Sequence, residues 1–275
     1  MTQIVPSEYR GKAFSRFGGI NRIGWFFGPV AGGYTAGSLG VDIPFYFISI
    51  VSIFTALIIF FSREPKYEPS DNSGNNKSRT FKETVAENKK IFAIGGSGHF
   101  IMQFLRQCRH VLIPIWAFSI GLGVEDLGLI QSISAAIDMT LFYPVGLIMD
   151  KYGRKWTSVP SIILLSSGFI FLTYANSFTG LMIVGLLLGF ANGLGSGAML
   201  TLGSDLSPKN QPGSFLGIWR LFGWSGNSAG GPISGAIAQT VGNTASALSV
   251  SMIGGIGVII FSFFLPETLK NRSSL

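Results

Sequence analysis

Residues 43–61 read IPFYFISIVSIFTALIIFF, a run of 19 residues without a charged side chain. In an α-helix that rises about 1.5 Å per residue, such a run is long enough to cross a hydrocarbon layer about 30 Å thick. A membrane-spanning β-strand would instead alternate apolar and polar residues over roughly ten positions, and this stretch does not. It therefore predicts a transmembrane α-helix.

Similar apolar runs recur along the whole chain of 275 residues. Hydrophobic residues make up 47% of it and charged residues only 12%, and the mean hydropathy is +0.45. A soluble domain has more charge and less apolar surface than this. We predict an all-α membrane protein with eight transmembrane helices, at residues 14–38, 41–61, 91–118, 125–149, 157–175, 180–203, 213–238 and 245–265.

The net charge of +7 follows the predicted topology. Sixteen of the 20 Lys and Arg residues fall in one alternating set of connections, and the turns near residues 40, 122, 177 and 242 contain none. Because Lys and Arg are retained on the cytoplasmic side, we predict a multi-pass protein of a plasma or inner membrane with both termini in the cytoplasm. The charge thus indicates orientation, and it argues against a nucleic-acid partner.

Residues 62–90 divide the chain into two parts that repeat each other. This polar segment is predicted to be a flexible cytoplasmic linker between residues 1–61 and residues 91–275. At an offset of 202 to 203 residues, Gly28, Pro29, Gly32, Phe60, Phe61 and Glu64 match Gly231, Pro232, Gly235, Phe263, Phe264 and Glu267. The first two helices therefore duplicate the last two.

The connection at residues 146–155, GLIMDKYGRK, resembles motif A of the major facilitator family, G-x-x-x-D-R/K-x-G-R-R/K. Its glycines permit a tight turn, and its basic residues suit an anionic membrane surface. The resemblance implies that Asp150 acts as a conformational gate by facing the positive N-terminal end of the helix at residues 11–16. The gate residues would be Gly146, Asp150, Lys151, Gly153, Arg154 and Lys155. An ordinary basic turn is the alternative.

Residues 24–33, GWFFGPVAGG, are similar to motif C of the drug:proton antiporters. The motif residues are Gly24, Gly28, Pro29, Gly32 and Gly33. Where the family pattern has a further glycine, this chain has Ser15. Glycines four apart allow helices to approach closely and Pro29 bends the helix, so tight packing without antiport is the alternative. A similar glycine ladder runs through Gly185, Gly189, Gly193 and Gly197.

These motifs and the repeat together resemble the major facilitator family, in which two parallel six-helix halves hold a substrate near the membrane midplane. On that resemblance, the chain corresponds to helices five to twelve, and its N-terminal half is incomplete. The resemblance implies that a complete cavity also needs the missing N-terminal helices.

Polar side chains inside the predicted helices are costly in lipid, so each is a candidate for a substrate or proton pathway. His99, Gln103, Arg106 and His110 are spaced 4, 3 and 4 apart, which places them within about 60° on one helix face. The other candidates are Arg22, Gln131, Asp138, Asn192, Arg220 and Asn227. Bonding between packed helices is the alternative role. Arg109 points away from this face and is expected to snorkel to the outer surface.

Asp138 and Arg106 are predicted to form an ion pair within the membrane. Both lie roughly 18 to 20 Å from the turn that joins their helices, at about 1.5 Å per residue. If they pair, a movement of Arg106 would change the proton occupancy of Asp138, which makes Asp138 the candidate proton carrier. A purely structural pair is the alternative, because pairing alone makes two buried charges tolerable.

The sequence favours a secondary transporter of small organic molecules that works by alternating access, and motif C favours proton-coupled multidrug efflux. Four arginines against one aspartate inside the helices favour instead an organic anion or phosphorylated metabolite as substrate. A non-transporting membrane fragment is a third possibility. The sequence has no nucleophile triad, metal-ligand spacing or P-loop, so we expect no enzyme activity, metal or cofactor. The expected partners are the substrate, the lipid bilayer and protons.

Overall fold

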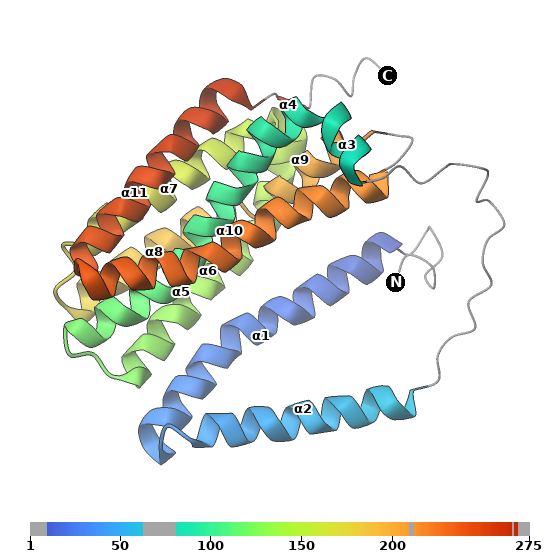
Figure 1. Cartoon of the computed structure of the whole chain (residues 1–275). Helices are drawn as coiled ribbons and strands as arrows, with labels where there is room; N and C mark the ends of the chain where they lie inside the picture. Colours follow the sequence, from blue (N-terminus) through green and yellow to red (C-terminus); the bar gives the residue numbers. More distant parts are fainter. Residues whose placement is uncertain (1–9, 63–80, 209–211, 266, 269–275) are drawn as a thin grey trace. The chain divides into compact units, whose positions relative to one another are not determined.

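The computed structural model describes residues 10–62, 81–208, 212–265, 267 and 268, with side chains from residue 23 onward. Within these ranges every regular element is a helix (Figure 1). The long helices are α1 (Arg10–Leu39), α2 (Ile43–Phe61), α5 (Ser97–Ser119), α6 (Val124–Tyr152), α7 (Lys155–Leu172), α8 (Phe178–Leu194), α10 (Pro212–Thr240) and α11 (Asn243–Ile259). The short ones are α3 (Phe81–Glu87), α4 (Lys89–Ile91), α9 (Ala198–Leu206) and the π-helices η1 (Phe92–Gly96) and η2 (Ile260–Phe264). The predicted all-helical fold is confirmed.

Five stretches of the described chain are long and apolar enough to cross a membrane. They are Ile43–Phe61, Val124–Tyr152, Lys155–Leu172, Phe178–Leu206 and Asn243–Phe264. The remaining long helices, α1, α5 and α10, are less apolar because they carry glycines and the arginines that the sequence places inside spans. The polar residues are thus concentrated on a few helices.

The chain forms two compact units. The first comprises residues 1–77 and 123–132, and the second comprises residues 78–122 and 133–275. The border at residues 77 and 78 falls inside the segment predicted to be a linker, and α6 begins in the first unit and ends in the second. The described part of that segment contains the short helices α3 and α4.

In the first unit, α1 approaches the start of α6 through glycines. A Cβ atom added to Gly33 would lie 2.8 Å from the carbonyl oxygen of Val124 and 3.0 Å from the Cα atom of Gly128. The other glycines of the motif-C stretch, Gly24, Gly28 and Gly32, have nothing within 4 Å of such an atom. Close packing in this stretch therefore depends on Gly33.

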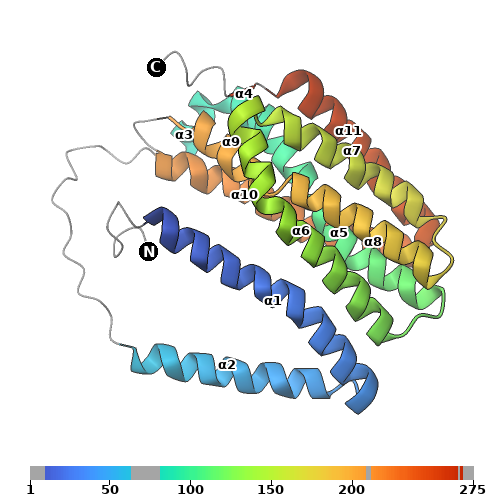
Figure 2. The same cartoon turned by 180° about the vertical axis from the view of Figure 1, so that it is seen from behind.

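In the second unit, α5 lies along α10 and also contacts α7, α8 and α11 (Figure 1). Gly226 and Gly230 of α10 face the backbone of α5 at Phe100 and Phe104. A Cβ atom on Gly230 would lie 2.7 Å from the carbonyl oxygen of Phe104, and one on Gly226 would overlap Phe100. The close approach of the two helices thus requires glycine. The opposite view shows α7 beside α8 (Figure 2).

The helix predicted at residues 180–203 is interrupted. It ends as α8 at Leu194 and resumes as α9 at Ala198, and Gly197 has a φ of +76°, in the left-handed region that glycine readily adopts. The ladder of four glycines is therefore not one continuous packing surface. Gly189 and Gly193 pack against Ser134 and Leu141 of α6, whereas Gly197 lies at the break.

Candidate functional site

Charged residues of α5 and α6 meet at Asn192, which lies in the last turn of α8. The Asn192 side-chain amide donates to a carboxylate oxygen of Asp138 over 3.0 Å. On the other side, Nη2 of Arg106 donates to the backbone carbonyl of Asn192 over 3.5 Å, and Nη1 donates to the Gln103 side chain over 3.1 Å. Asn192 therefore connects the acid of α6 with the cation of α5.

The break after α8 explains why side chains gather there. The last carbonyl groups of a helix lack partners within the helix and carry a partial negative charge. Ser161 of α7 donates to the carbonyl of Ala191 over 2.6 Å, beside the Arg106 contact with Asn192. A Cβ atom on Gly195 would lie 2.7 Å from Nη2 of Arg106, so this glycine leaves room for the guanidinium.

Arg109 is buried, with only 6% of its surface exposed. Its guanidinium donates to the carbonyl of Leu188 in α8 over 3.2 Å, and it is attracted electrostatically by the negative charge of Asp138. The expectation that Arg109 snorkels to the outer surface is wrong. The reason is that α5 is enclosed by α7, α8, α10 and α11, so two faces of this helix lie inside the protein.

His99 of the predicted stripe is buried against α10. Its Nδ1 lies 3.0 Å from the carbonyl oxygen of Trp219, to which the protonated ring nitrogen donates, and Gly223 packs against the ring. His110 and Gln131 are half-buried, and on α10 Arg220 is exposed and Asn227 half-buried. The Arg22 side chain lies outside the described residues. A role of these six residues in a substrate or proton pathway stays a prediction.

The motif-A turn is held by acids from distant segments. The Glu267 carboxylate accepts the backbone N–H groups of Arg154 and Lys155 over 3.0 and 3.1 Å, which caps the start of α7. The Arg154 side chain is 1% exposed, and its Nε lies 2.7 Å from the Asp205 carboxylate without an aligned hydrogen bond. Gly153 has a φ of +111°, so glycine is required in the turn.

Sequence reasoning missed Asp205 and Glu267. Glu267 was visible as the repeat partner of Glu64, but no spacing rule connects it to a turn more than a hundred residues earlier. Asp150, by contrast, has 75% of its side chain exposed, and one oxygen lies 3.9 Å from Nη1 of Arg154. Its expected partner, the helix end at residues 11–16, carries no described side chains, so the gate role stays a prediction.

One known protein family matches the chain along its whole length. The family model described as Major Facilitator Superfamily matches residues 1–105 and 95–275. A solved structure with a similar fold is a POT family transporter in complex with 5-aminolevulinic acid. It is 15% identical with a TM-score of 0.53, and the match covers 95% of this chain and 55% of that one.

Three curated relatives are similar in sequence. The uncharacterized MFS-type transporter YfkF of Bacillus subtilis is 26% identical, over 76% of this chain and 53% of the relative. The hexuronate transporter of the same organism is 27% identical, over 59% and 38%. The multi-drug resistance efflux pump PmrA homolog of Lactococcus lactis is 23% identical, over 98% and 67%. The chain thus spans about half the length of the first of these relatives.

Proposed function

Because the chain belongs to the Major Facilitator Superfamily, we propose that it works as part of a secondary active transporter that moves small organic molecules by alternating access. The family and the fold are those of multi-pass membrane transporters rather than enzymes. The observation that carries the proposal is the connection of Asp138, Asn192 and Arg106 beside a broken helix. In transporters, interrupted helices supply backbone groups for substrate and coupling ions near the membrane midplane.

Asp138 is the proposed proton carrier. Its carboxylate accepts from the Asn192 side chain, and the same residue offers its carbonyl to Arg106. A shift of α8 relative to α5 or α6 would therefore change the contacts of acid and cation together. Since a nearby cation favours the charged carboxylate, such a shift would couple proton binding to conformation.

Multidrug-type efflux is the favoured subclass. The similarity to a multi-drug resistance efflux pump over 98% of this chain supports it, as does the motif-C stretch at residues 24–33. A cationic substrate would also find a counter-charge at Asp138. On this hypothesis, substrate and proton compete for the same carboxylate.

An organic-anion transporter is the second candidate. Arg106 and Arg109 both direct their guanidinium groups to carbonyls of α8, and guanidinium groups bind carboxylates and phosphates through paired hydrogen bonds. A hexuronate transporter is among the similar proteins. A carboxylate substrate would then bind at Arg106 in place of the Asn192 carbonyl, whose contact of 3.5 Å is longer than the 3.1 Å contact with Gln103.

Substrate binding by the purified chain in lipid nanodiscs separates these candidates. Efflux predicts that a cationic dye binds and that Asp138→Asn abolishes this binding. The anion hypothesis predicts that a sugar acid binds and that Arg106→Gln abolishes this binding. Asp126→Asn, at the opposite end of α6 from the motif-A turn, is the matched control. If neither ligand class binds, the chain by itself forms no substrate site, as a non-transporting fragment would.

The proposed orientation has a separate test. A reporter fused at Ser73 is expected in the cytoplasm, and one inserted near Asn176 outside, because basic residues gather on the first side. Reversed signals at both positions would overturn the orientation. In liposomes, we expect no uphill transport by these 275 residues alone. The described residues before position 91 contain two long helices, α1 and α2, whereas each half of the family fold has six. Accumulation against a gradient would contradict this.

A further inference from the structure

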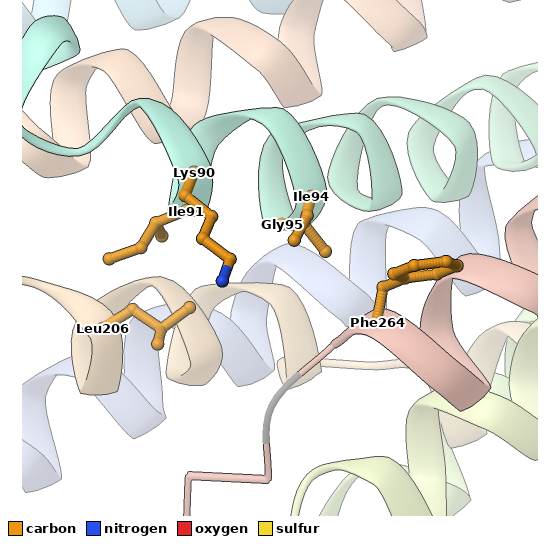
Figure 3. Close-up of a pocket in the computed structure, with 6 residues that line it drawn as sticks. All are labelled: Lys90, Ile91, Ile94, Gly95, Leu206 and Phe264. Atoms are coloured by element: carbon orange, nitrogen blue, oxygen red, sulfur yellow. The ribbon is translucent and has the colours of Figure 1, made fainter.

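A pocket of about 300 Å³ lies in the second unit between the continuous segment of α4 and η1, the end of α9 and the end of η2. It is formed by the end of α9 and by α4, η1 and η2, and its lining residues are Lys90, Ile91, Ile94, Gly95, Leu206 and Phe264 (Figure 3). This volume is at the lower end of the range of small-molecule pockets. The pocket is separate from Asp138 and Arg106, which do not line it.

Two walls of the pocket are π-helical. Ile94 and Gly95 belong to η1, and Phe264 is the last residue of η2. π-Helices are rare and occur frequently at functional sites, because the wider turn displaces side chains from regular helix positions. Gly95 is backed by the buried indole of Trp219, which an added Cβ atom would approach to 2.9 Å. The wall at Gly95 therefore rests on a fixed support.

Among the described residues that line the pocket, Lys90 is the one that carries a charge. Figure 3 shows its ammonium group directed into the space between Leu206 and Phe264, which are apolar like the rest of the lining. The preceding residue, Lys89, is also exposed but does not line the pocket. A cation above an apolar pocket matches a ligand that combines an anionic group with a hydrocarbon chain.

The pocket lies at the membrane face where the basic residues gather. Phe264 is three residues before Glu267, which caps the motif-A helix, and Lys155 donates to the carbonyl of Ser262 within η2. On the proposed orientation this face is cytoplasmic. The cytoplasmic leaflet contains anionic lipids, and basic pockets between helices at that face bind their headgroups. A soluble anion would leave the apolar wall in contact with water.

We propose that this pocket binds one anionic phospholipid, with its phosphate at Lys90 and the upper part of one acyl chain against Ile91, Ile94 and Phe264. The lipid fills the space that the two π-helices leave and holds the ends of α4, α9 and η2 together. This lipid site adds to the proposed transport function and does not depend on the substrate.

The test measures lipid retained by the full chain after purification from mixed phosphatidylglycerol and phosphatidylcholine, using native mass spectrometry. We expect one phosphatidylglycerol to remain bound in preference to phosphatidylcholine. Lys90→Gln is expected to reduce this preference about fivefold, since each basic residue near an anionic surface has an effect of that order. Lys89→Gln is the matched control and should retain the preference of the unaltered chain.

A second variant tests the apolar part of the pocket, which is proposed to hold the acyl chain. Ile94→Trp fills the pocket and keeps Lys90, so retention of either lipid should be lost while circular dichroism shows the native helix content. Equal preferences in Lys90→Gln and Lys89→Gln, or full retention in Ile94→Trp, would overturn the proposal. Displacement of the lipid by inorganic phosphate or glycerol phosphate would also overturn it, because it would identify a site for soluble anions. None of these measurements requires transport activity.

Discussion

Helices α1 and α2 repeat the sequence of α10 and α11, yet the two copies are buried very differently. α2 has no buried residue, whereas α11 buries Ser246, Ala247, Val250, Ser251, Gly254 and Gly257. The difference is equally clear between α1 and α10. The glycines through which α10 contacts α5 are Gly223, Gly226 and Gly230, and at an offset of 203 residues α1 has Ile20, Ile23 and Phe27 instead.

The repeated Gly-Pro pattern contributes little to the closest packing of the second copy, because a Cβ atom on Gly231 would meet Val111 of α5 only at the ordinary contact distance of 3.5 Å. Gly28 and Gly32 of α1 and Gly235 of α10 all have open space where a Cβ atom would stand. Close contact in α10 instead depends on glycines that the first copy lacks. The repeat indicates a shared architecture, whereas the closest contacts of α10 lie at positions where the two copies differ.

The largest expected effect concerns where the coupling charge lies. If the packed second unit holds the site, Asp138→Asn should abolish gradient-driven accumulation in a transporter completed with N-terminal helices, while downhill exchange persists. Asp126→Asn, in the part of α6 that belongs to the first unit, should leave both rates unchanged. Proton-driven uptake with unaltered pH dependence in Asp138→Asn would remove Asp138 from the coupling role.

The difference in packing predicts the next effect. Gly226→Ala places a methyl group against the Phe100 backbone, which cannot move aside as a flexible side chain can, so we expect a loss of about 1–3 kcal/mol in the free energy of unfolding. Gly28→Ala enters open space and should change stability by about 0.5 kcal/mol or less. Detergent-based unfolding of both variants measures this, and equal losses would contradict the comparison.

The fold was largely predictable because apolar length is a local property of the sequence. All eight long helices coincide with predicted spans, and the contact of Gln103 with Arg106 follows from their spacing of three residues. The break at residues 195–197 was not predictable in this way. Glycines spaced by four fit a continuous helix equally well. Gly197 adopts the left-handed conformation because of its surroundings in the folded protein, which the spacing does not describe.

The candidate site shows the same limit. Helical periodicity placed Arg109 on a face away from the stripe, but it cannot tell how many faces of a helix are covered by neighbours. Likewise, the contact of Glu267 with the start of α7 joins residues 113 and 112 positions apart. Such contacts are set by the packing of α7 against α11, which no local pattern describes.

That cap provides the third prediction. Glu267→Ala removes the acceptor of two backbone N–H groups at a helix start, where a lost cap costs about 1 kcal/mol. Glu267→Gln keeps an acceptor and should recover part of this loss. In the first copy, Glu64→Ala should have less effect, because the described residues of α2, the helix before Glu64, include no buried side chain. Thermal unfolding distinguishes the three variants, and an equal loss for Glu64→Ala would oppose the expected asymmetry.

The smallest expected effect concerns the hairpin of each copy. Ser246 of α11 donates to the carbonyl of Ser234 in α10 over 2.7 Å, and both residues are fully buried. The corresponding positions of the first copy are Ala31 and Ile43, so this interhelical bond exists only in the second. Side-chain hydrogen bonds between membrane helices contribute on average about 0.6 kcal/mol, because the separated helices also find partners.

Ser246→Ala should therefore lower the free energy of unfolding by about 0.6 kcal/mol. Ser49→Ala in α2 is the matched control, since the Ser49 hydroxyl bonds only within its own exposed helix, to the carbonyl of Phe45 over 2.8 Å. This second change should be close to neutral, because the carbonyl of Phe45 keeps its place in the helix hydrogen-bond ladder. If Ser49→Ala destabilised the chain as much as Ser246→Ala, the hairpin of the first copy would be as tightly packed as that of the second, and the contrast in burial would not describe the folded protein.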